Sequence, residues 1–380
     1  MLRRILASLA IALCAQSGWA ATSGVCREKT FARKPGWTLS GAWASGGAEL
    51  LIADPLYETI WRYTASGKSL GSISEPLKST IRDLSPISIQ SSAGGLVLEV
   101  AGNGFLFLSN KMEPAKTRGV MTKSAKGPYS IGGGLWQWTP VGNEIIAFLD
   151  LYPTSLPSPW DPKFLDKWFS GFVRFPADNP AAFRLLQREG RTQIDIRSEE
   201  RNLFRTGYSY MTSIGTTAYI LSMDARMSLM KNEAGSDELK PLRSFPLGES
   251  DVAPALPRFK YAEDYPKTLA QVERESMPVG LYSQGGLLYV LWRKPSPQGT
   301  RWILSSIDPQ KDRYIGATEI PLKANHVVVV PGDNTWAFIE KGPVKGFGVQ
   351  DVPRVLLVPT SLLQASMGKV IKCEHDKNQD

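Results

Sequence analysis

The sequence predicts an all-β fold made of repeated four-stranded antiparallel units. Short runs of apolar, β-branched and aromatic residues recur along most of the chain, and glycine, asparagine or proline separates each run from the next. The runs also fall into groups of four. Because one such sheet cannot bury both of its faces alone, the units must stack on one another, and stacking around a ring gives a β-propeller.

Segment 49–73 shows the unit most clearly. Its first apolar run stops at Asp54-Pro55, because proline has no N–H for a ladder and aspartate accepts hydrogen bonds from its own turn. Ser66-Gly67 provides the next turn. Together with a strand upstream, four strands are expected at 41–44, 50–53, 59–63 and 70–73.

Five further units follow with similar spacing. They are expected at 86–120, 135–186, 208–244, 278–319 and 327–358, and the last of them has no clear fourth strand. The sequence therefore predicts a six-bladed β-propeller, closed near its termini, as a single domain over residues 21–380. A seven-bladed ring and a pair of β-sandwiches are the alternatives.

One blade resembles a known repeat. Residues 49–71 resemble a repeat of the six-bladed NHL-type propellers, and the matching residues are Ile52, Asp54, Ile60, Tyr63 and Gly67. The other units share only the strand spacing. The resemblance implies a ring of six sheets, and some six-bladed propellers are lactonases or related hydrolases that hold calcium in the central channel.

The N-terminus has the pattern of a secretory signal peptide. Arg3 and Arg4 precede an apolar run at 5–13, and small residues precede a cleavage site after Ala20. We therefore expect residues 1–20 to be removed and the protein to be periplasmic or secreted. Lipid attachment at Cys14 is disfavoured, because a small residue is needed where Leu13 stands.

Charge and hydropathy exclude two classes of partner. Residues 1–20 carry two arginines and no acid, so the net charge of +8 becomes +6 in the mature chain. No basic run concentrates this charge, so nucleic acid is not an expected partner. No later segment is long and apolar enough to span a membrane.

The cysteines predict one disulfide. Without Cys14, only Cys26 and Cys373 remain, one near each end of the mature chain. An oxidising compartment favours a bond between them, and the ends of a ring-shaped fold meet where the last blade is closed. Two free or metal-bound thiols are the alternative.

The sequence predicts no catalytic residue. Ser69 lies in a Gly-x-Ser-x-Gly pattern, but the helix that a nucleophile elbow requires does not follow it. His326 has no evident catalytic partner, and with two histidines in the chain the common zinc spacings are absent.

Calcium would be the metal of the hydrolase alternative, since it takes oxygen ligands. The acids considered as its ligands are Glu49, Glu99, Glu144 and Asp150. Ordinary strand and turn carboxylates are the simpler interpretation, and no EF-hand loop is present. We therefore predict no metal site and no cofactor.

Long insertions are expected on one side of the ring. They lie near 152–167, 187–207, 247–277 and 341–354. Each joins the second to the third strand of a blade or one blade to the next, and these connections leave a propeller on the same side. Long loops in a compact domain are often functional.

The insertion-bearing face is therefore the predicted working surface of an exported binding or protein-interaction module. Aromatic and arginine anchors are favoured in interfaces, and the candidates on this face are Tyr152, Trp160, Trp168, Arg191, Arg201 and Tyr265. Arginines within 188–205 form either a solvated charge cluster or a site for an anionic small ligand or an acidic protein. We expect a monomer, and a calcium-dependent hydrolase is the alternative function.

Overall fold

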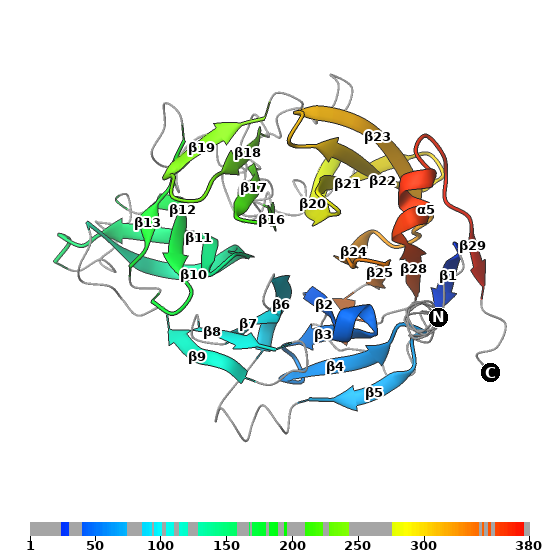
Figure 1. The fold of residues 1–380 in the computed structure, drawn as a ribbon, viewed down its shortest axis with the longest axis horizontal. Coiled ribbons are helices and arrows are strands. Elements are labelled where there is room, and N and C mark those ends of the chain that lie inside the picture. Colours follow the sequence, from blue (N-terminus) through cyan, green and yellow to red (C-terminus); the bar gives the residue numbers. More distant parts are fainter. Residues whose placement is uncertain are drawn as a thin grey trace, which may run out of the picture.

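The chain forms a ring of six antiparallel sheets, a six-bladed β-propeller (Figure 1). The computed structural model describes residues 24–29, 40–73, 86–92, 95–100, 104–109, 114–120, 128–157, 167, 169–179, 182–188, 194–195, 210–222, 228–242, 276–341, 344–345, 349–350 and 354–375. The predicted fold class and blade number are confirmed. Residues 1–20 lie outside the described residues.

Blade 1 has the strands that the sequence predicts. From the centre outward these are β2 (Ser40–Ala44), β3 (Glu49–Asp54), β4 (Thr59–Thr64) and β5 (Ser69–Ser72). Asp54 ends β3 as expected: its Oδ1 accepts the N–H of Leu56 at 3.2 Å, and its Oδ2 accepts Nε1–H of Trp61 at 2.9 Å. One carboxylate thus fixes both the turn and the next strand.

Blades 2 and 3 repeat this order. Blade 2 consists of β6 (Pro86–Ser92), β7 (Gly95–Val100), β8 (Gly104–Leu108) and β9 (Pro114–Val120). Blade 3 consists of β10 (Tyr129–Val141), β11 (Glu144–Pro153), β12 (Phe169–Pro176) and the short β13 (Arg184–Leu185), with β15 (Ile194–Asp195) also paired to β12.

Blades 4 and 5 follow the same plan. Blade 4 consists of β16 (Tyr210–Ile214), β17 (Thr217–Ser222), β18 (Ser228–Asn232) and β19 (Glu238–Pro241). Its outer edge also carries β14 (Gln187–Arg188), which runs parallel to β19. Blade 5 consists of β20 (Met277–Gln284), β21 (Leu287–Ser296), β22 (Gly299–Asp308) and β23 (Arg313–Ile320).

Blade 6 is completed by both ends of the chain. Its first three strands are β24 (His326–Val330), β25 (Thr335–Lys341) and β28 (Val355–Pro359). The fourth strand, unclear in the sequence, is β1 (Cys26–Lys29), which pairs antiparallel with β28; β29 (Cys373–His375) then pairs parallel with β1. The remaining elements within the described ranges are a hairpin of β26 (Val344–Lys345) and β27 (Val349–Gln350), the helix α5 (Thr360–Ala365) and the 3₁₀ turn η1 (Ser45–Gly47).

A disulfide and a buried ion pair hold this closure. Cys26 and Cys373 are bonded, with their Cα atoms 4.4 Å apart, as the cysteine count predicts. Nε and Nη2 of Arg354 each donate to one carboxylate oxygen of Glu340 at 2.9 Å, and Nη1 donates to Glu28 of β1 at 3.1 Å. Burial acts to lower the pKa of Arg354, but its bonds and charge attraction to the two glutamates outweigh burial and raise it.

Among the residues that the structure describes, the core is divided into six hydrophobic clusters, one between each pair of neighbouring blades. Strand alternation explains how one strand serves two of them. In β21, Leu288, Val290 and Trp292 pack toward blade 4, while Tyr289 and Leu291 pack toward blade 6. Second strands are therefore apolar on both faces, which is why their sequences read as unbroken apolar runs.

The two sides of the ring differ in their connections. We call the side that carries the connections between first and second strands the turn side. It has tight two-residue turns such as 142–143, 215–216 and 285–286, whose glycines Gly142, Gly215 and Gly285 have φ near +60°. The strand ends that flank 158–166, 196–209, 243–275 and 351–353 all lie on the opposite side, which we call the insertion side.

Candidate functional site

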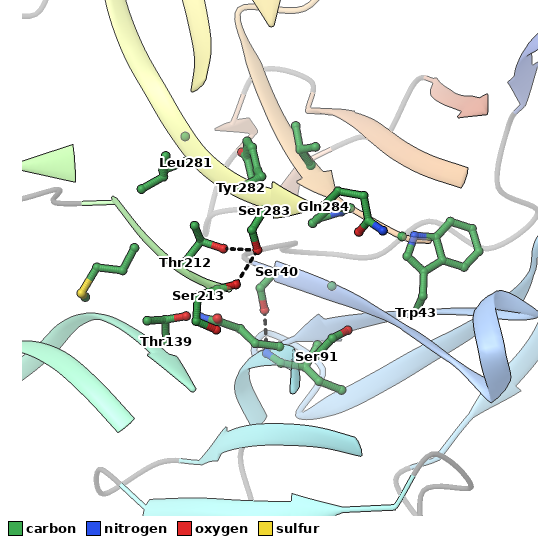
Figure 2. A pocket seen from close by; sticks show the side chains of 18 of the residues that line it. Ser40, Trp43, Ser91, Thr139, Thr212, Ser213, Leu281, Tyr282, Ser283 and Gln284 are labelled. Atoms are coloured by element: carbon green, nitrogen blue, oxygen red, sulfur yellow. Dashed lines mark hydrogen bonds between the residues drawn. The ribbon is translucent and has the colours of Figure 1, made fainter. Parts of the chain in front are cut away.

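A cavity of about 520 Å³ occupies the centre of the ring (Figure 2). It is lined by the first strand of every blade: β2, β6, β10, β16, β20 and β24. Gly46, Gly47, Gly332 and Asp333, which lie in connections from first to second strands, extend the lining to the turn side. The size is within the range of about 300–1,000 Å³ that small-molecule sites occupy.

Hydrogen bonds join neighbouring blades around this cavity. Figure 2 shows the best-defined group, in which Thr212 Oγ1 donates to Ser283 Oγ at 2.9 Å and Ser283 Oγ donates to the carbonyl of Ser213 at 2.7 Å. Ser213 Oγ in turn donates to the carbonyl of Pro140 at 2.7 Å, so these bonds join blades 3, 4 and 5.

The other junctions are bridged in the same way. Ser40 Oγ accepts Ile89 N–H at 2.7 Å between blades 1 and 2. Gln90 Nε2 donates to the carbonyl of Trp138 at 2.7 Å between blades 2 and 3, and Gln284 Nε2 donates to Asp333 Oδ1 at 2.8 Å between blades 5 and 6. Several polar side chains of the lining are therefore held in fixed orientations.

Aromatic side chains form part of the wall. Trp43 is 8% exposed and donates from Nε1 to the carbonyl of Val330 at 3.1 Å, which ties blade 1 to blade 6. Gly332 permits this position, because a Cβ there would lie 2.6 Å from the indole Cδ1. Tyr282 lies along its own strand over Gly280, and its ring packs edge-on against Trp336 at 5.9 Å.

The lining carries almost no charge. Asp333 is the single ionisable acid or base among the described lining residues, apart from the phenols of Tyr210 and Tyr282. Burial raises the pKa of the Tyr282 phenol well above its ordinary value, and the nearby Tyr210 acts in the same direction. Tyr282 therefore keeps its proton at physiological pH and has an O–H group that can donate a hydrogen bond.

The four acids considered for calcium do not come together. Glu49 pairs with Arg62 at 2.9 Å, and Glu144 accepts from Arg174 Nε at 2.6 Å. Asp150 accepts from Ser170 Oγ at 2.6 Å, within blade 3. None of these carboxylates lines the central cavity.

Glu99, the fourth acid, is buried between blades 2 and 3. Its Oε2 accepts Ser88 Oγ–H at 2.6 Å and Trp138 Nε1–H at 2.7 Å. Burial raises the pKa of this carboxyl, while the two hydrogen bonds act to lower it. Glu99 therefore links blades 2 and 3 through its bond to Trp138, which is a structural role.

The described residues do not fit a calcium-dependent hydrolase. They contain no group of three or more His, Cys, Asp and Glu side chains that could hold a metal ion. Calcium takes six to eight oxygen ligands, usually with carboxylates among them, and the described part of the cavity lining offers one carboxylate, that of Asp333.

Of the predicted binding-face residues, one lies within the described part of the chain. Tyr152 is in β11, opposite Ser130 of β10, and is 7% exposed. Trp160, Trp168, Arg191, Arg201 and Tyr265 lie outside the described residues. Tyr152 is not among the residues that line the cavity.

Ser69 and His326, the two residues considered and disfavoured as catalytic, both lie away from the central cavity. Ser69 lies in the outer strand β5, where its Oγ accepts Gly71 N–H at 3.3 Å, so the pattern around it is a strand and not a nucleophile elbow. His326 is exposed at the start of β24 and is not part of the cavity lining.

The cavity residues themselves were not identified from the sequence. Their signal is compositional: first strands such as β6 and β16 mix serine, threonine and glutamine with apolar residues, while the second strands β7 and β17 are more apolar. Such a difference indicates a partly polar channel only once the first strand of each blade is known to be the innermost.

Comparison with known proteins supports the fold. No family model matches the chain, and no curated protein matches its sequence. Among solved structures, a member of the duf4221 family from Bacteroides vulgatus is similar with a TM-score of 0.55 and 8% identity, over 88% of this chain and 95% of that one. The chain is a six-bladed β-propeller.

Two further solved structures have lower similarity to this chain. A calcium-binding protein, regucalcin, from Agrobacterium tumefaciens has a TM-score of 0.42 and 8% identity, over 86% of this chain and 90% of that one. A streptogramin B lyase has a TM-score of 0.42 and 12% identity, over 88% and 97%. Identities this low concern the fold alone.

Proposed function

We propose that the protein is an exported binding module that acts through its insertion side. The observation that carries this proposal is the asymmetry of the ring. The strand ends flanking the long insertions lie on one side, whereas connections on the other side are short. Long connections mounted on a rigid scaffold are where binding residues concentrate.

Export is supported by the disulfide. Cys26 and Cys373 are bonded across the ring closure, and such bonds persist in oxidising compartments. The signal-peptide pattern at residues 1–20 points in the same direction. No helix in the described ranges is long and apolar enough to span a membrane.

A binding role accounts for the acids better than hydrolysis does. Glu49, Glu144 and Asp150 each engage a partner within a blade, and Glu99 is buried at a junction. These partners give each carboxylate a structural role. A metal-dependent hydrolase is therefore not proposed.

The proposed ligand of the insertion side is an anionic surface or molecule. Segment 188–205 contains five arginines, and arginine recognises carboxylate and phosphate through two parallel hydrogen bonds. We propose Trp160 and Arg201 as the residues that contribute most to this interaction, because tryptophan and arginine are enriched among the residues that carry most of the binding energy in interfaces.

Poly-glutamate binding tests this proposal. We expect the double substitution Trp160→Ala with Arg201→Ala to weaken binding of a fluorescent poly-glutamate peptide at least tenfold. The matched control is Arg313→Ala with Tyr314→Ala, since Tyr314 is an aromatic residue 45% exposed beside an exposed arginine at the turn side. Both pairs should leave the melting temperature nearly unchanged. Equal loss of binding in the two variants, or no binding by the native protein, would overturn the proposal.

A further inference from the structure

We infer that the central cavity is a second binding site, for an uncharged ligand rich in hydroxyl groups, such as a polyol or saccharide. This inference is independent of the insertion side, because it concerns the first strands and the turn side. Its basis is the combination of a central cavity of about 520 Å³, a described lining with a single charged group, and fixed hydrogen-bonding groups.

The charge of the lining selects against ions. No lysine, arginine or histidine is among the described lining residues, so an anion bound there would lose its hydration without gaining a counter-charge. The carboxylate of Asp333 already accepts a bond from Gln284. An uncharged ligand avoids this desolvation penalty.

The bonds between blades leave specific atoms available to a ligand. Ser40 Oγ accepts in its bond to Ile89, so the serine proton is not used in that bond. Gln90 and Gln284 donate through Nε2, so their bonds to other blades leave the amide oxygens as acceptors. Thr212 donates to Ser283 and keeps the lone pairs of its own oxygen.

These donors and acceptors are preorganised. Each of them is held by a bond to a neighbouring blade, so little side-chain freedom remains to be lost when a ligand binds. The protonated phenol of Tyr282 adds a donor from blade 5. A molecule with several hydroxyl groups, which both donate and accept, matches such a mixed set.

Apolar surfaces complete the match. Trp43, Leu281 and Met211 line the same cavity as the polar groups. Polyols and saccharides have C–H faces as well as hydroxyl edges, so they can contact both kinds of surface. A purely apolar ligand would displace water from the polar groups of the lining without replacing its hydrogen bonds, which is costly.

Titration calorimetry with maltotriose, glucose and glucuronate tests this inference. We expect the native protein to bind at least one of the two neutral sugars and to bind glucuronate at least tenfold more weakly than the neutral sugar that binds more tightly. Tyr282→Phe removes one hydroxyl and should weaken neutral-sugar binding about 5- to 10-fold. Ser91→Tyr places a ring in the cavity from an exposed strand position and should abolish binding.

A native fold in each variant is checked by circular dichroism and melting temperature. If neither neutral sugar binds at concentrations up to about 10 mM, ten times a dissociation constant of 1 mM, the inference fails. It also fails if glucuronate binds as well as the neutral sugar that binds more tightly, or if folded Ser91→Tyr protein retains binding. Trp160→Ala with Arg201→Ala should not affect sugar binding, so the two proposals can fail separately.

Discussion

Substitution of Arg354 tests the closure of the ring energetically. The Arg354 side chain is 10% exposed and the Glu340 side chain only 3%. Arg354→Met would retain the packing of the side chain but leave the Glu340 carboxylate buried without its counter-charge. Breaking a buried ion pair in this way costs about 3–5 kcal/mol.

The loss also reaches the closing strand. Arg354 binds Glu28 of β1 and donates to the carbonyl of Pro321 at 2.7 Å, so both contacts disappear with the guanidinium. For a domain of about 350 residues, the entropy of unfolding is about 0.7 kcal/mol/K, so 3–5 kcal/mol corresponds to about 4–7 °C in melting temperature. Differential scanning calorimetry and urea unfolding measure the two quantities.

A second variant separates charge from packing. Arg354→Met with Glu340→Gln removes the buried charge, while the remaining amide oxygen can still accept the backbone N–H groups of Lys323 and Ala324. We expect the double variant to recover about 2 kcal/mol or more relative to Arg354→Met alone. A loss below about 1 kcal/mol in Arg354→Met, or a double variant no more stable than the single one, would refute this reasoning.

Three further predictions concern stability. Replacing Cys26 and Cys373 with alanine should lower the free energy of unfolding by up to about 6 kcal/mol relative to the disulfide-bonded protein, since the bond closes a loop of 347 residues. Urea unfolding measures this loss, and the native protein under reducing conditions should be as stable as the variant. Because burial raises the pKa of Glu99, the contribution of Glu99 to native stability should fall as pH rises from 4.5 through the raised value. The native protein should therefore lose more stability over this range than Glu99→Gln, measured by urea unfolding at several pH values, and an identical pH dependence of the two proteins would contradict the assignment. Gly95→Ala should lower the free energy of unfolding by at least about 2 kcal/mol, since φ is +137° and a Cβ would lie 2.3 Å from the carbonyl oxygen of Leu108. Gly46→Ala has open space around the new Cβ and should lower it by about 1 kcal/mol, so equal melting temperatures of the two variants would contradict this prediction.

Much of the fold follows from local sequence. Asp54 and Gly67 mark turns whose backbone bonds appear as expected, and Asp308 accepts the N–H groups of Gln310 and Lys311, both at 3.1 Å, in the turn between β22 and β23. Turn chemistry and strand composition act over a few residues, so they can be recognised without knowledge of the whole ring.

Local sequence does not show which distant segments pair as neighbouring strands. The fourth strand of blade 6 is Cys26–Lys29, whose partners Val355, Leu356 and Leu357 lie at the other end of the chain. Likewise, Gln187–Arg188 pairs with β19 of blade 4 and not with blade 3. A short strand takes its register from its neighbours, which local composition does not reveal.

The cavity depends even more on the assembled ring. Ser40, Gln90 and Thr212 resemble ordinary strand residues in the sequence, and only ring closure brings them to one cavity. The same holds for Glu99, whose burial results from Trp138 of the next blade. The direction in which a side chain points and its burial at a blade junction are tertiary properties, so local sequence cannot identify cavity residues or show that Glu99 is buried.

Mass spectrometry of alkylated protein tests most directly whether the two ends of the chain close the ring. Without reductant, Cys26 and Cys373 should remain unlabelled, and proteolysis should release one disulfide-linked pair of peptides that contains both. After reduction under denaturing conditions, both cysteines should be labelled. Labelling of both cysteines in the unreduced, denatured protein, with no linked pair, would contradict the closure described here.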